Sequence, residues 1–144
     1  HVPIGNRKWW WSVRWATLQC IKLIDTLRVV CRDPSQPIVE LSGGNQQKLL
    51  IGRWVLQPPK LLILDEPTRG VDMASKDEIH QTIKQLADQG MGVLLISSDL
   101  PEVLALADLI YVMRAGSVVG RLDGATATES QVMSLASLGE RAVA

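Results

Sequence analysis

One short segment of the sequence has the residues that a phosphate-binding turn needs. Leu41, Ser42, Gly43, Gly44 and Asn45 form a polar, glycine-bearing turn that leads directly into a predicted helix. The first backbone N–H groups of a helix have no partner within it, and the helix dipole adds partial positive charge there. Such a turn can therefore bind an anion such as phosphate. A serine in this place is also an ordinary helix N-cap, and the residues alone leave that alternative open.

A second segment ends in two neighbouring carboxylates. Residues 60–64 form an apolar run of strand length, and Asp65 and Glu66 follow it directly. Ligands of α/β sheets bind at the carboxyl ends of strands. Asp65 could there hold the Mg²⁺ of a bound nucleotide, and Glu66 could orient or deprotonate a water molecule. The alternative is a pair of solvated acids that open a turn before Pro67.

The elements that must hold these segments alternate between helix and strand. Apolar residues at helical spacing, together with caps and terminating prolines, predict helices over residues 16–30, 42–57, 75–89 and 128–138, and a short helix capped by Asp99. Continuous apolar runs predict strands over 60–64 and 92–97, and the pairs 109–113 and 118–122 flank a hairpin turn. Thr128 and Gln131 stand in capping-box positions. This alternation predicts an α/β fold with partly parallel strands.

Composition excludes several other classes of protein. The chain has 144 residues, of which 47% are hydrophobic and 21% charged, as in a globular protein with one core. Its formal net charge is zero, so no global charge argues for a nucleic-acid partner, and we expect none. Cys20 and Cys31 lack metal-ligand spacing and are expected to be reduced thiols. With no signal peptide and no apolar run of membrane-spanning length, we expect a cytoplasmic protein.

The order of the motifs resembles that of the ATP-binding-cassette (ABC) ATPases. Their signature motif, Walker B motif and D-loop correspond here to LSGGNQQK, LLILDEP and TRGVD. Asn45, and the run from Arg69 to Asp72, are similar to those of monosaccharide importers (ribose, galactose, xylose, autoinducer-2). The resemblance runs from about residue 38 to about residue 139. It leaves out a tryptophan cluster, which could be an interface anchor or ordinary packing of a helical subdomain: Trp9, Trp10, Trp11 and Trp15.

The resemblance implies a partial P-loop NTPase core with a mainly parallel sheet and flanking helices. Residues 1–40 would be a remnant of the helical subdomain with a Trp-rich start. Residues 41–144 would be the C-terminal half of a nucleotide-binding domain, the second of two that such ATPases carry in one polypeptide.

The resemblance also implies roles for single residues. Leu41 to Asn45 would complete the ATP site of a partner domain, whereas Asp65 would contact Mg²⁺ and Glu66 would polarise the attacking water. Asp72 would belong to the D-loop. Ser98 occupies the place of the family's switch histidine, and because a hydroxyl cannot act as a base near neutral pH, hydrolysis at this domain's own site is in doubt.

One motif of the family is absent from the 144 residues. No G-x-x-x-x-G-K-[ST] phosphate loop occurs among them. We therefore expect ATP and Mg²⁺ to belong to the intact parent protein, and the chain alone to be inactive and to bind neither. The expected partners are another nucleotide-binding domain, the membrane permease subunits of the parent transporter, and further copies of the chain, since a missing strand exposes sheet edges. When assembled in the parent transporter, the chain would lie at the inner face of the membrane.

Two other functions remain to be weighed. The chain could be a non-catalytic interaction or regulatory module from a truncated gene, which associates with another ATPase domain. ABC-type ATPases of DNA repair and chromosome organisation share the signature and Walker B motifs. They carry long coiled coils between their halves, however, and the close motif spacing of this sequence argues against that class.

Overall fold

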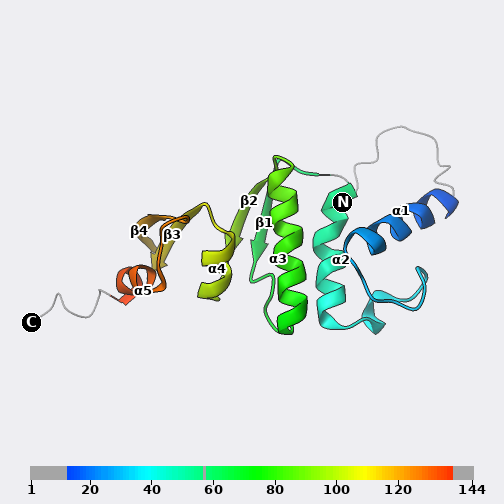
Figure 1. Ribbon diagram of the computed structural model, residues 1–144, viewed down its shortest axis with the longest axis horizontal. Coiled ribbons are helices and arrows are strands. Elements are labelled where there is room, and N and C mark those ends of the chain that lie inside the picture. Colours follow the sequence, from blue (N-terminus) through cyan, green and yellow to red (C-terminus); the bar gives the residue numbers. More distant parts are fainter. Residues whose placement is uncertain (1–12, 57, 138–144) are drawn as a thin grey trace, which may run out of the picture. The chain divides into compact units, whose positions relative to one another are not determined.

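The first unit of the chain is built on two packed helices. The computed structural model describes residues 13–56 and 58–137, and the chain divides at Pro58 into two compact units. Helices α1 (Val13–Thr26) and α2 (Gly43–Leu56) contact each other, and a short 3₁₀ helix, η1 (Ile38–Glu40), precedes α2 (Figure 1). The core of this unit consists of buried apolar side chains from α1, the loop after it and the start of α2: Leu23, Leu27, Val29 and Leu41.

Helix α1 ends four residues before the predicted end at residue 30. The N–H of Val29 donates to the carbonyl of Ile24 (2.9 Å) and that of Arg28 to the carbonyl of Asp25 (3.2 Å). This is the hydrogen-bond pattern of a Schellman motif, and Arg28 takes the left-handed conformation (φ 49°) that the motif requires. The chain turns here because Leu27 and Val29 are then buried in the core. The apolar spacing continued past the turn and made the helix look longer.

The second unit begins with a parallel β–α–β element. Strands β1 (Leu61–Asp65) and β2 (Gly92–Ile96) pair in parallel, with Leu61 opposite Gly92 and Asp65 opposite Ile96. Helix α3 (Met73–Asp88) provides the crossover and runs beside the two strands (Figure 1). Four of its residues are buried: Ile79, Thr82, Ile83 and Leu86. The predicted strands and helix are thus confirmed to within two residues at each end.

The rest of the second unit is a hairpin with a helix on either side in sequence. Helix α4 (Leu100–Leu106) leads into β3 (Leu109–Arg114) and β4 (Ser117–Asp123), which pair antiparallel, and α5 (Glu129–Ser137) packs against both strands. Ala115 and Gly116 both have positive φ, as the two-residue turn of a twisted hairpin demands. The expected α/β fold is present. Its described strands form one parallel pair and one separate antiparallel pair.

One face of the β1–β2 pair exposes apolar side chains. Alternate residues of β1, Leu62 and Leu64, are buried, and the intervening ones point to the other face. On that face the exposed fractions lie between 48% and 58% for four residues: Leu61, Ile63, Leu94 and Ile96. Separately, no helix in the described ranges is both long and apolar enough to cross a membrane.

Candidate functional site

In the signature turn, a neighbouring asparagine donates two hydrogen bonds to the serine hydroxyl. The Oγ of Ser42 accepts from the side-chain Nδ2 of Asn45 (2.9 Å) and, at 3.4 Å, from its backbone N–H. The Asn45 amide is itself oriented, because its Oδ1 accepts from the N–H of Val30 at 3.0 Å. A serine hydroxyl has two acceptor positions and one proton. With both acceptor positions taken, the Ser42 hydroxyl can contribute only its proton to a further hydrogen bond, as an anion would need.

The glycine at the start of α2 is not required by packing among the described residues of its unit. A Cβ built on Gly43 meets no atom within 4 Å, and Gly43 is exposed. By contrast, a Cβ on Gly52, later in α2, would collide with the side chain of Leu27. Gly52 therefore permits the approach of α2 to the turn after α1. The bare backbone of Gly43 instead leaves open space in front of the first N–H groups of α2.

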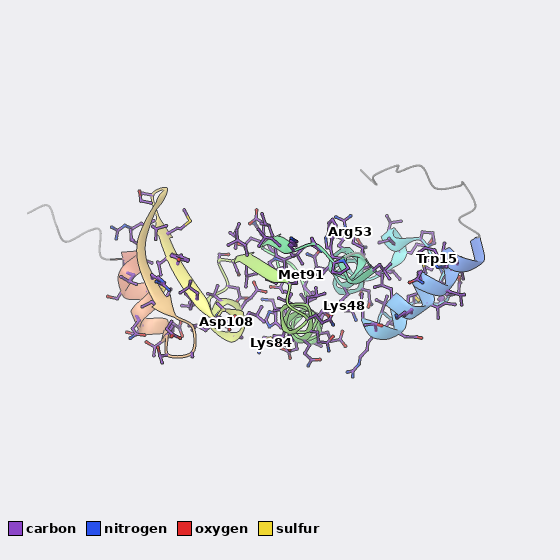
Figure 2. The ribbon with its side chains drawn as sticks, turned by 90° about the horizontal axis from the view of Figure 1, so that it is seen from above. Trp15, Lys48, Arg53, Lys84, Met91 and Asp108 are labelled. Atoms are coloured by element: carbon purple, nitrogen blue, oxygen red, sulfur yellow. The ribbon has the colours of Figure 1, made fainter. Side chains whose placement is uncertain are left out.

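A buried lysine of α2 contacts the loop that follows α1. Lys48 is only 2% exposed, and its Nζ donates to the carbonyl of Arg28 at 2.8 Å. It extends from α2, where Figure 2 labels it. Lys48 and Asn45 are three residues apart in α2, and they bind the loop after α1 at the carbonyl of Arg28 and the N–H of Val30, respectively. The sequence places Lys48 within the signature helix, but nothing in it indicated this contact.

The two carboxylates lie where the ends of β1 and β2 meet. Asp65 is exposed at the last position of β1, opposite Ile96. Glu66 takes a left-handed backbone conformation (φ 48°), and its N–H donates to the carbonyl of Ile96 at 2.8 Å. Its Oε1 accepts from the backbone N–H of Ser98 at 2.9 Å. The structure thus joins Glu66 to position 98, and the contact uses the backbone of Ser98 rather than its hydroxyl.

The aspartate of the expected D-loop caps α3. The Oδ1 of Asp72 accepts from the N–H of Ser75 at 3.0 Å and its Oδ2 from the Ser75 hydroxyl at 2.8 Å. These bonds, the backbone one first, hold the pKa of the Asp72 carboxyl below its usual value. Its carboxylate therefore orients α3. A role of Asp72 in cofactor binding, as part of the D-loop, stays a prediction.

Two side-chain pairs join α3 to α4, and sequence reasoning missed both. The Nζ of Lys76 donates to the Oδ2 of Asp99 at 2.5 Å, and one turn further along α3 the Nε2 of His80 lies 3.0 Å from the Oε1 of Glu102. The hydrogen bond from Lys76 lowers the pKa of Asp99, and the same bond raises the pKa of Lys76. Their helical spacings, 76 with 80 and 99 with 102, were the only signal available.

A magnesium ion would find one protein ligand at this sheet edge. Among the described residues no three His, Cys, Asp or Glu side chains gather as a metal site. Asp65 offers a single exposed carboxylate beside Glu66. Mg²⁺ that arrives with a nucleotide is held by one or two carboxylates together with the phosphates, so Asp65 fits this kind of site.

Comparison with known proteins finds relatives among the ABC transporter proteins. The family described as "ABC transporter" matches residues 11–69, which extends the resemblance well before its expected start near residue 38. An arabinose import ATP-binding protein of Yersinia pestis is 52% identical over 125 residues, which are 87% of this chain and 24% of that protein. A protein of Rhizobium meliloti, named for ribose/galactose/methyl galactoside import, is 50% identical over 125 residues, again 87% and 24%. The chain thus spans about a quarter of these relatives.

A solved structure supports the fold. The structure of an ATP-binding cassette of an ABC transporter matches 90% of this chain and 53% of its own length, with a TM-score of 0.69 and 24% identity. A likeness at that identity concerns the fold alone. The family match begins at residue 11 and so includes α1. Helix α1 carries no short motif, but it packs on α2, the helix that follows the signature turn. Trp15 lies in α1 and is about half exposed, whereas Trp9, Trp10 and Trp11 lie outside the described residues.

Proposed function

Because this chain belongs to the ABC transporter ATP-binding proteins, we propose that it forms part of the ATP-hydrolysing subunit of a carbohydrate importer. The names of its relatives, which concern arabinose and ribose/galactose/methyl galactoside import, support the class of cargo. The importer's permease subunits would be its membrane partners, and the cytoplasmic face of the membrane its location. ATP and Mg²⁺ belong to that assembled ATPase.

The signature turn serves the ATP of a partner nucleotide-binding domain. The observation that carries this role is that Ser42, whose acceptor positions are used by Asn45, lies beside open space at Gly43. A γ-phosphate there would accept from the Ser42 hydroxyl and from the N–H groups at the start of α2. Leu41 is buried in the core and fixes the turn from the other side.

The carboxylates serve the ATP site of this chain's own domain. Asp65 would contact Mg²⁺, which neutralises developing charge on the phosphates when the nucleotide is bound. Glu66 would accept a hydrogen bond from the attacking water through the oxygen that Ser98 does not occupy, since Oε1 takes the Ser98 N–H. Asp72 holds the first turn of α3, which follows the D-loop.

A chimera tests the proposal. In the Yersinia pestis relative, the matching 125-residue stretch is replaced by that of this chain. We expect the chimera to bind Mg-ATP and to release phosphate. We expect the 144-residue chain alone to give no micromolar heat signal in an ATP titration, because its sequence contains no phosphate loop. A folded chimera without ATP turnover, or saturable binding by the chain alone that Asp65→Asn abolishes, would contradict the proposal.

The apolar face of the β1–β2 pair favours a second role, association between copies of this chain. Four half-exposed aliphatic side chains lie on the β1–β2 pair, and among the described strands the outer edge of each has no partner strand, so they form a surface that another copy could cover. We expect the 144-residue chain to sediment as a dimer or larger species. Ile63→Lys should weaken its self-association roughly 100-fold, because a lysine would lose its hydration there. Met73→Lys, at a more exposed apolar position of α3 (76% against 58% for Ile63), is the control, and a wild-type monomer at all concentrations would refute this role.

A further inference from the structure

We propose that Lys76 is a positioning residue for Glu66, acting through Asp99 and the backbone N–H of Ser98, and this role rests on the proposed function of Glu66. The contacts run in sequence from α3 to the carboxylate. Lys76 binds Asp99, Asp99 directly follows Ser98, and the Ser98 N–H donates to Glu66. A residue of the D-loop helix thereby determines where the water-polarising carboxylate is held.

The segment between β2 and α4 is short and fastened at Asp99. The Oδ1 of Asp99 accepts from the N–H of Glu102 and so caps α4, while its own N–H donates to the Oγ of Ser97 at 3.0 Å. Its Oδ2 is the atom that Lys76 contacts. Oδ1 of Asp99 thus caps α4, and Oδ2 forms the ion pair with Lys76. Ser98 lies directly before this fixed residue, so its N–H direction depends on how Asp99 is held.

The burial and the contacts of Lys76 suit it to hold the segment between β2 and α4 in place. Its side chain is 26% exposed and that of Asp99 30%, so the pair is partly shielded from water and salt. Lys76 lies in the first turn of α3, and its N–H donates to the carbonyl of the capping Asp72 at 2.9 Å. His80 and the buried Glu102 hold the next turn of the two helices together. A shift of the D-loop would therefore be carried to Asp99 through the start of α3.

The backbone conformation of Glu66 makes the Ser98 contact consequential. Glu66 takes a left-handed conformation (φ 48°), and its Oε1 accepts from the Ser98 N–H at 2.9 Å. A non-glycine residue in that conformation persists where surrounding contacts hold it. Loss of the lysine would leave the Glu66 backbone bond to Ile96 in place and loosen the contact at its carboxylate.

Amide hydrogen exchange of Ser98, followed by NMR in the 144-residue chain, tests this role without any nucleotide. We expect Lys76→Met to accelerate exchange at Ser98 by about tenfold, which is the loss expected for a partly exposed charge-assisted hydrogen bond. Lys76→Arg should restore protection to within about threefold, because it keeps the charge. Lys84→Met is the matched control, since Lys84 is an exposed lysine of the same helix, labelled in Figure 2. Exchange along the β1–β2 ladder should not change.

A double-mutant cycle shows whether the effect passes through Glu66. Glu66→Ala alone should also accelerate exchange at Ser98, and adding Lys76→Met to it should accelerate exchange little further. Three results would overturn the proposal: unchanged Ser98 exchange in Lys76→Met, equal acceleration along the β1–β2 ladder, or an undiminished Lys76 effect without Glu66. Because no nucleotide is present, this outcome stays separate from that of the chimera.

Discussion

Gly43→Asp lowers ATP hydrolysis by the chimera by about 100-fold or more, while its thermal unfolding stays unchanged or shifts to higher temperature. The two effects have opposite signs for one physical reason. A carboxylate at the first residue of a helix interacts favourably with the helix dipole, and a Cβ at Gly43 meets nothing within 4 Å. The same carboxylate occupies the space where a partner's γ-phosphate should lie. At an effective dielectric constant near 20, two such charges about 4 Å apart repel by about 4 kcal/mol.

Two companion variants separate charge from size at this position. Gly43→Asn has nearly the shape of the aspartate without its charge, so it should retain at least about tenfold more activity than Gly43→Asp. Gly43→Ala tests the methyl group alone. Phosphate release and thermal melting are measured on the same preparations. Equal activity of all three variants with the parent chimera would show that no anion binds at this turn.

The sequence predicted those features that depend on neighbouring residues. The Asp99 cap of α4 and the reciprocal bonds of Thr128 and Gln131 at the start of α5 are present as expected. Each of them joins residues three apart, and their types determine the contact. The contact of Glu66 with Ser98 was also accessible from the sequence, since both follow strands of a fold that was predicted to be partly parallel.

Features that depend on tertiary packing could not be predicted in this way. Lys76 and Asp99 are 23 residues apart and pair only because α3 and α4 lie together. The left-handed position that ends α1 is occupied by Arg28 rather than by a glycine, so the sequence does not mark it. The helix ends there because the residues on either side of Arg28 are buried. The orientation of the Asn45 amide depends on Val30, which is 15 residues away. In all three cases a local pattern names the residue but not its partner.

Glu66→Gln in the chimera reduces the ATP turnover that depends on this chain's own carboxylates by about 100-fold or more. The glutamine keeps an oxygen for the Ser98 N–H, so the backbone around position 66 should not move. What is lost is the negative charge that polarises water, and general-base groups contribute about 10²- to 10⁴-fold to such reactions. Single-turnover phosphate release, measured with saturating Mg-ATP, separates this loss from a change in binding.

Ser98 decides between two explanations of the result. Ser98→Ala keeps the backbone N–H that holds Glu66, so we expect turnover within about threefold of the parent chimera, because the serine hydroxyl is not a base near neutral pH. If Glu66→Gln has no effect but Ser98→His raises turnover, the missing imidazole limits hydrolysis at this site. ATP would then be consumed at the partner's site, to which this chain contributes its signature turn. In that case Gly43→Asp would also abolish turnover, whereas Asp65 and Glu66 would contribute to nucleotide binding but not to hydrolysis.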